Sequence, residues 1–208
     1  MNAASGHDAA PTSWARDARA TANALARFAT AHSPADLSSG RESTALPRMG
    51  VYAWYFRALP GLSPGVRDHC VRRGPWQLLY VGIAPSRPGS RSTLRRRLRL
   101  HVAGNASSST LRLTLGCLLA DSLGLRLQAK RASKRCDWNA GEPGLSAWLA
   151  THGRVVVVAH PRPWDVEQAV IGHLRPPLNL AHNLQHPFAQ RLSDLRAEHR
   201  ARAMRKIR

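Results

Sequence analysis

The segment that most constrains this chain is a strand-like run followed by an arginine-rich helix, at residues 78–101. Its first part, Leu-Leu-Tyr-Val-Gly at 78–82, is short and apolar, which is typical of a buried strand. A turn-rich loop follows, and residues 94–101 then have helical periodicity, with Ser92 or Thr93 available as the N-cap. The segment therefore predicts an α/β core in which a helix packs beside a sheet.

The arginines of this helix divide according to the face on which they lie. The face that must pack inward carries three aliphatic residues: Leu94, Leu98 and Val102. Arg96 and Arg99 point away from that face, toward water or a polyanion. Arg97 and His101 line one edge of the buried face, and Arg95 lines the opposite edge. Helical geometry thus leaves two arginines, Arg95 and Arg97, as candidates to reach into a cleft beside the sheet.

Two further segments complete the predicted sheet. Residues 50–56 form a second strand-like run, which should pair antiparallel with residues 76–83 because consecutive strands usually neighbour one another. Four successive valines predict a third strand at 154–159. We therefore expect an α/β fold with a small three-stranded, mainly antiparallel sheet flanked by helices. An amphipathic helix in 13–31 and a basic helix in 191–208 are expected as terminal additions.

The net charge of +19, from 31 basic and 12 acidic residues, indicates a polyanionic partner. A coding bias would account for the excess of Arg over Lys, but not for the shortage of acidic residues. Nucleic acid is the expected partner rather than a membrane, because no basic amphipathic helix has an aromatic anchoring face. The three cysteines include no CxxC pair, so neither a disulfide framework nor a zinc knuckle is predicted. With no apolar leader, we expect a cytoplasmic protein.

Glu167 is the first candidate for chemistry. It lies in a helix that Asp165 would cap, amid an apolar face of four residues: Val166, Val170, Ile171 and Leu174. An unpartnered carboxylate buried there would cost several kcal/mol, so it requires a cation. The alternative is a solvated glutamate that meets the positive end of the helix dipole. No paired-carboxylate motif of a two-metal nuclease occurs, and three other acids, Asp68, Asp137 and Glu142, lie in turn-rich sequence.

Other polar residues each admit two interpretations. Tyr52 and Tyr80 are candidates for chemistry, but buried tyrosines are also common in strands. A basic cluster is either a solvated surface or a phosphate-contacting one, and consists of Lys130, Arg131, Lys134 and Arg135. His182 and His186 are four residues apart, but no third ligand lies nearby, so a zinc site is not expected.

The tripeptides Gly-Val-Tyr at 50–52 and Tyr-Val-Gly at 80–82 resemble the paired signature of the GIY-YIG nuclease family, with Val in place of Ile in both. The helix with Arg97 and His101 is similar to the arginine helix of that family, which favours Arg97 over Arg95. Downstream, Glu167 and the run Pro-Pro-Leu-Asn at 176–179 resemble the metal-binding glutamate and the asparagine that ends the core. The resemblance covers roughly residues 49–183.

The resemblance implies roles for the matching residues. Tyr52 would act as general base or orient the attacking water, with Tyr80 in support. Arg97 would offset the charge that develops on the scissile phosphate. Glu167 would hold Mg²⁺, or Mn²⁺ in its place. A neighbouring Mg²⁺ and Arg97 are expected to lower the tyrosine pKa from its usual value near 10.

Two further residues complete the predicted site. His101 would assist proton transfer or bind a phosphate, and a structural role stays equally open. Asn179 would orient the backbone or Glu167. Phosphate contacts are expected from Arg95, Arg96 and Arg99 together with the basic cluster at 130–135.

The sequence thus predicts an Mg²⁺-dependent endonuclease that acts on DNA. One alternative is a basic nucleic-acid-binding module of the same fold that does not cut, and another is a structural RNA-binding protein, which would not need a carboxylate in an apolar helix face. We expect a disordered start (1–12), an N-terminal helix and linker (13–48), a nuclease-like domain with a helical insertion (49–187), and a basic tail (188–208).

Overall fold

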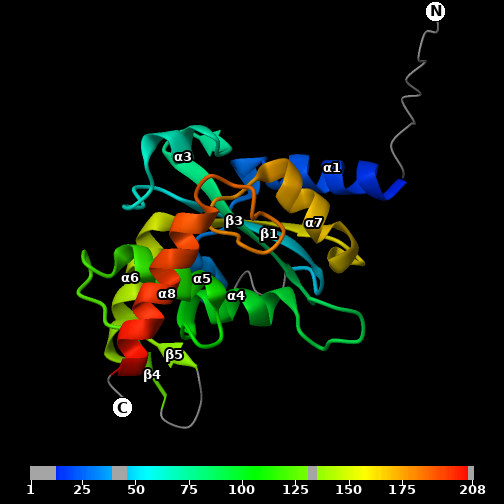
Figure 1. The fold of residues 1–208 in the computed structure, drawn as a ribbon. Helices are drawn as coiled ribbons and strands as arrows, with labels where there is room; N and C mark the ends of the chain where they lie inside the picture. The colour runs from blue at the N-terminus through cyan, green and yellow to red at the C-terminus, as the bar shows by residue number, and fades with distance from the viewer. Residues whose placement is uncertain (1–12, 39–45, 131–134, 206–208) are drawn as a thin grey trace, which may run out of the picture.

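A computed structural model describes residues 13–38, 46–130 and 135–205, and the predicted disordered start lies outside these ranges. A four-stranded antiparallel sheet in the order β2-β3-β1-β6 forms the centre, with helices on both of its faces (Figure 1). The predicted α/β fold with a mainly antiparallel sheet is confirmed. Among the described residues, no helix has the length and apolar character needed to span a bilayer.

The three predicted strands form the body of the sheet. β1 (Gly50–Phe56) lies between β3 (Trp76–Ala84) and β6 (Gly153–Ala159), and every residue of β1 is buried. The prediction of three strands missed a fourth, β2 (Arg72–Arg73), which pairs with the first two residues of β3. Two exposed arginines carry no apolar alternation, so this short strand has no hydrophobic signal in the sequence.

The helices form two layers, one on each side of the sheet (Figure 1). On one side, α1 (Ser13–Leu25) packs along α7 (Pro163–Leu174). The other side carries a larger group: α2 (Pro34–Ser38), α4 (Leu94–Ala103), α5 (Thr110–Leu119), α6 (Glu142–His152) and α8 (Ala189–Arg205). α8 is the predicted C-terminal helix, and it packs against α5 and against a small hairpin of β4 (Gln128–Ala129) and β5 (Cys136–Asp137).

Two connections are more ordered than the sequence suggested. The predicted N-terminal helix ends at Leu25 and is followed by a short turn, η1 (Phe28–Thr30). The described part of the predicted linker contains α2, and His32 bridges to β6. Likewise, the connection between β1 and β3 contains α3 (Pro64–Asp68) as well as β2. Segments this short are below the length at which periodicity is informative.

Three acidic residues assigned to turn-rich sequence lie in regular structure instead. Asp68 ends α3, Asp137 is buried in β5, and Glu142 begins α6 after the short turn η2 (Asn139–Gly141). The predicted N-cap of α7 was also wrong. That helix begins at Pro163, because proline is favoured in the first turn, and Asp165 forms an ion pair with Arg162 at 2.6 Å.

Candidate active site

A pocket of about 190 Å³ lies beside β1 and β3. Its walls include side chains from β1, β3, α4 and α7. Four of the predicted site residues line it together: Tyr52, Tyr80, Arg97 and Glu167. Gly82, Ile83, Ser86 and Ser92 complete its lining. Residues separated by more than one hundred positions in the chain therefore share one cavity.

Tyr52 lies at the base of this pocket. Its register partner on β3 is Gly82, and a Cβ at position 82 would collide with the Tyr52 hydroxyl. The hydroxyl lies 2.7 Å from Nε2 of His101 and accepts a hydrogen bond of 3.3 Å from Nε of Arg97. Burial raises the pKa of Tyr52, and the charge of Arg97 offsets only part of this rise. The protein alone thus does not produce the lowered tyrosine pKa that we expected with a metal present.

His101, which was predicted at one edge of the buried face of α4, is fully buried. Its Nδ1 lies 2.7 Å from Oγ of Ser109, which also caps α5 by accepting a hydrogen bond from the Arg112 backbone N–H. Burial, with the nearby charges of Arg97 and Arg112, holds the pKa of His101 well below its usual value. Its imidazole is therefore neutral, and Tyr52, His101 and Ser109 form a continuous hydrogen-bonded row.

Arg112 and Glu142 support this row, and sequence analysis did not identify either of them. Arg112 is fully buried and donates to the carbonyls of His101 and Val102, each at 3.0 Å. It also forms an ion pair of 2.6 Å with Glu142, whose other oxygen accepts from the backbone of Ala106. Arg112 thus ties the end of α4 to α5 and α6. Arg112 and Glu142 lie 30 residues apart in the chain, so no local pattern in the sequence relates them.

Glu167 reaches the pocket from α7 and is half-buried. Burial raises the pKa of its carboxyl group, an effect opposed by the charges of His182 and Arg97. None of the described residues forms an ion pair with it. The three aliphatic neighbours Val166, Val170 and Ile171 pack into the layer between α7 and the sheet.

Asn179 closes the free edge of β3 in place of a strand. Its side-chain oxygen accepts from the N–H of Val81 at 2.9 Å, and its amide donates to the carbonyl of Val81 at 2.8 Å. One residue earlier, the N–H of Leu178 donates to the carbonyl of Leu79. These bonds hold the backbone that carries Tyr80, so Asn179 contacts backbone rather than Glu167.

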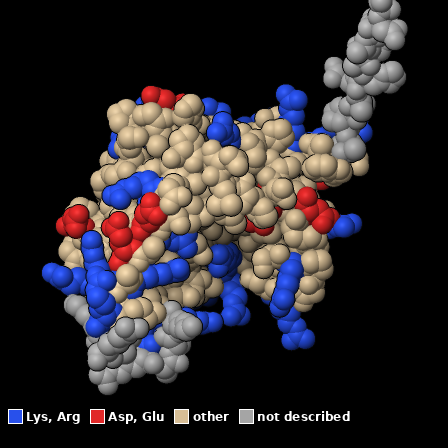
Figure 2. Space-filling model, viewed as in Figure 1, with Lys and Arg blue, Asp and Glu red and all other residues tan. Residues whose placement is uncertain are grey.

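The described members of the predicted phosphate-binding set lie on the surface, away from the pocket lining. Arg95, Arg96 and Arg99 are exposed on the outer side of α4. Lys130 forms an ion pair with Asp137 at 2.8 Å, and Arg135 is exposed, whereas Arg131 and Lys134 lie outside the described residues. Lys and Arg side chains gather over α8 and the small hairpin (Figure 2). His186 is buried, and His182 has a positive φ of 59°.

The comparison with protein families agrees with this geometry. A family model described as the GIY-YIG catalytic domain matches residues 50–198, which is more than two thirds of the chain. The chain belongs to the GIY-YIG family. No curated protein and no solved structure matches it. The two tripeptides of the GIY-YIG signature lie on the paired strands β1 and β3, and the family's nuclease character implies a nucleic acid substrate.

Proposed function

We propose that this GIY-YIG protein is a divalent-metal-dependent endonuclease that hydrolyses phosphodiester bonds in DNA. The observation that carries the proposal is the placement of the Glu167 carboxylate in the same pocket as Tyr52, Tyr80 and Arg97. A carboxylate, a guanidinium and two phenols around one small cavity are the groups needed to hold a cation, neutralise a phosphate and move a proton. The net charge of +19 favours a polyanionic substrate.

The residues of the pocket fit Mg²⁺ or Mn²⁺. Burial disfavours the charged form of Glu167, so its carboxylate is stabilised by any cation that binds there. Glu167 supplies the one carboxylate in the described lining of this pocket, and no cluster of three or more His, Cys, Asp or Glu side chains forms within the described residues. Mg²⁺ is commonly bound by one or two carboxylates and retains several waters. When bound, the ion would polarise the phosphate oxygens as a Lewis acid.

The hydrogen bonds around Tyr52 define a route for the proton of the attacking water. Because Arg97 donates to the Tyr52 oxygen, the tyrosine proton is free to face Nε2 of His101. Neutral His101 is able to accept that proton, while Nδ1 is held by Ser109. In the proposed step, Tyr52 takes a proton from water as it passes its own to His101. This avoids a free phenolate, which burial disfavours. The positive charge moves instead to the imidazolium of His101, which burial disfavours as well, so this proton must leave His101 again within the catalytic cycle.

Arg97 has two tasks in this proposal. One nitrogen of its guanidinium donates to Tyr52 and another donates to the carbonyl of Ser108, which fixes the side chain at the pocket wall. Its charge then lies close to where negative charge develops on the phosphate in the transition state. Tyr80, on the neighbouring strand, lines the pocket beside it.

The test compares supercoiled, linear and branched DNA with RNA, each incubated with Mg²⁺ or with EDTA. We expect cleavage of DNA in Mg²⁺ alone. In Glu167→Gln, cleavage should be lost while nucleic acid affinity in EDTA is kept or increased, because a negative charge has left the site. Asp165→Asn is the matched control, since it removes an acid of the same helix that is paired with Arg162 outside the pocket.

Three outcomes would contradict the proposal. Wild-type rates in Glu167→Gln would exclude its role as the metal ligand. Cleavage in EDTA would exclude metal dependence. If wild type binds nucleic acid but cuts none of the substrates, the protein is a binding module with a nuclease fold. Preferential cutting of RNA would change the substrate and leave the chemistry intact.

A further inference from the structure

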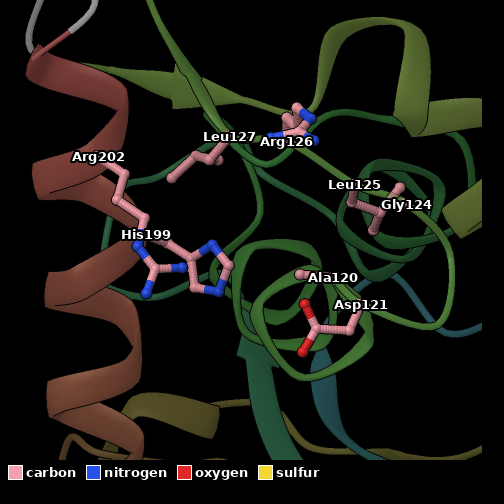
Figure 3. Close-up of a pocket in the computed structure, with 8 residues that line it drawn as sticks. All are labelled: Ala120, Asp121, Gly124, Leu125, Arg126, Leu127, His199 and Arg202. Atoms are coloured by element: carbon pink, nitrogen blue, oxygen red, sulfur yellow. The ribbon is translucent and has the colours of Figure 1, made fainter.

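A second pocket lies on the far side of α5, between residues 120–127 and α8 (Figure 3). Its volume is about 290 Å³, near the lower limit for small-molecule sites, so it suits a ligand of one ring system. Six of the side chains that line it determine its charge and polarity: Asp121, Leu125, Arg126, Leu127, His199 and Arg202. None of them belongs to the proposed active site.

The lining of this pocket contains an acidic and a basic side chain that do not form an ion pair with each other. Asp121, in the turn that follows α5, and Arg202 from α8 both line it, yet no ion pair between described residues includes Asp121. Arg202 has one ionic partner, Glu198, at 3.8 Å, which is a loose contact on an exposed surface. A carboxylate and a guanidinium on the walls of one cavity suit a ligand that presents hydrogen-bond donors on one edge and acceptors on another.

The remaining walls suit a flat, apolar ring. Leu125 and Leu127 are both buried, and the ring of His199 is held by an edge contact with Trp138, at 5.8 Å and 73° between the planes. Burial lowers the pKa of His199, so near neutral pH it offers an uncharged aromatic surface. Aromatic side chains of this kind stack on nucleobases that are not in a duplex.

The helix that carries His199 and Arg202 also carries a cation whose charge acts on Tyr80 of the proposed active site. Arg196 is half-buried one turn before His199, and its charge opposes the rise in the pKa of Tyr80 that burial causes. Three residues of helix correspond to ~4.5 Å along its axis. The second pocket and the charge of Arg196 thus lie on the same helix, one turn apart.

We propose that this pocket binds one unpaired nucleobase, with guanine as the preferred base. Guanine offers N1–H and N2–H₂ donors to Asp121, and O6 and N7 acceptors to Arg202, the commonest partner of that edge. A bare phosphate fits less well, because it would lie against the carboxylate of Asp121. The inference rests on the proposed function for its source of bases, since a nucleic acid substrate supplies them. The exposed Arg126 is available for the phosphate attached to that base.

Binding of the four 5′-mononucleotides GMP, AMP, CMP and UMP, measured by calorimetry in EDTA, tests the chemistry without requiring cleavage. We expect GMP to bind at least about 10-fold more tightly than the others. Asp121→Asn and Arg202→Ala should each remove this preference. Asp68→Asn and Arg205→Ala are matched controls, because both residues are exposed and neither lines the pocket.

A second arm distinguishes a base in a strand from a free nucleotide. Stem-loops that differ only in one unpaired guanine or cytosine are bound to Glu167→Gln in EDTA, so that neither is cut. Preference for the guanine stem-loop, reduced by excess GMP, identifies the ligand as a base of the strand. Preference among mononucleotides alone identifies a free nucleotide.

The proposal is overturned if neither arm discriminates guanine, or if Asp121→Asn retains the wild-type preference in both. Failure of the nuclease proposal has a different signature. In that case nucleotide preference persists although wild type cuts no substrate in Mg²⁺. Thermal unfolding of each variant confirms that the exposed substitutions leave the fold intact.

Discussion

Both faces of the central sheet are buried, but the side chains packed against them differ in polarity. On the side of α1 and α7, the core consists almost wholly of aliphatic and alanine side chains. On the side of α4, α5 and α6, the buried groups include His101, Ser109, Arg112 and Thr114. The first face supplies rigidity by apolar packing, whereas the second encloses polar groups that are nearly all hydrogen-bonded. Two side-chain groups on this face, the Thr114 hydroxyl and Nε1 of Trp54, have no hydrogen-bond partner among the described residues.

Two tyrosines of β1 show what this difference means. Tyr52 and Tyr55 are both fully buried, but they point to opposite faces of the strand. The Tyr55 hydroxyl donates to the carbonyl of Leu25 at 2.8 Å, and burial raises the pKa of Tyr55 to about 12. The Tyr52 hydroxyl instead meets His101 and Arg97 at the pocket. Burial is therefore the same for both, and the partners of the hydroxyl distinguish a structural tyrosine from a candidate for catalysis.

Removing each hydroxyl in turn is the strongest test of this comparison. Tyr52→Phe should reduce cleavage by about 10²-fold or more, the scale of losing a general base. Tyr55→Phe should leave cleavage unchanged and reduce the free energy of unfolding by about 1–3 kcal/mol, because the Leu25 carbonyl loses its partner. Single-turnover rates and denaturant unfolding on both variants provide the measurement.

The opposite pattern would break the comparison. If Tyr52→Phe cuts at the wild-type rate and is the less stable variant, then Tyr52 is an ordinary core residue. If both variants lose activity without losing stability, the two faces are coupled through β1 rather than separate in function.

The parts of the fold with strong periodicity were accessible from the sequence. The runs of aromatic and β-branched residues in β1, β3 and β6 predicted strands because such side chains are favoured on a pleated, buried surface. β2 was missed because two exposed arginines produce no such pattern. The N-cap of α7 was misplaced because Pro163 begins that helix earlier than Asp165.

The arrangement around His101 was not accessible from the sequence. The ion pair of Arg112 with Glu142 joins two helices, and the two residues are 30 positions apart. The sequence around either residue does not predict that it pairs with the other. The expected fall in the tyrosine pKa followed from charges alone. Burial, which has the larger effect in the protein itself, becomes visible only when the side chains are packed.

The outer side of α4 provides a contrast with its buried side. Replacing Arg95, Arg96 and Arg99 together by Gln should weaken binding to all sequences and reduce the salt dependence of the affinity by about one unit of slope per lost phosphate contact. The rate of the chemical step at saturating protein should stay within about 2-fold, because these residues do not line the pocket. Arg191→Gln in α8 is a single-charge control. An unchanged slope would show that the three arginines face only solvent.

Ser109 tests the inner side of the same region. Ser109→Ala should lower cleavage by about 10-fold, because His101 loses the hydrogen bond that fixes its tautomer and orientation. It should also remove about 1 kcal/mol of stability, since Ser109 caps α5. Ser109→Thr retains both hydrogen bonds and should restore activity. Ser109→Gly separates the effect on activity from the effect on stability. Glycine is accepted at a helix N-cap with little loss of stability, but it has no side chain to hydrogen-bond the imidazole of His101.

The smallest expected effect concerns stability and pH. Because His101 has a lowered pKa in the folded protein, it stays neutral there while the unfolded chain takes up a proton below about pH 6.5. Stability should therefore fall as the pH falls through this range, by at most about 1.4 kcal/mol per pH unit for this one group. His186 and His199, whose pKa values are also lowered, contribute in the same direction.

His101→Gln measures how much of this pH dependence of stability is due to His101 on the buried polar face. Its unfolding free energy should be lower than that of wild type at neutral pH, but should decline less steeply as the pH is lowered. His173→Gln, at an exposed position of α7, serves as the control for the loss of one imidazole. Equal slopes for wild type and His101→Gln would mean that the folded protein protonates this imidazole over the same pH range as the unfolded chain, so that it is charged below about pH 6.5. The proton route from Tyr52 to His101 would then be closed, because a protonated imidazole has no lone pair with which to accept.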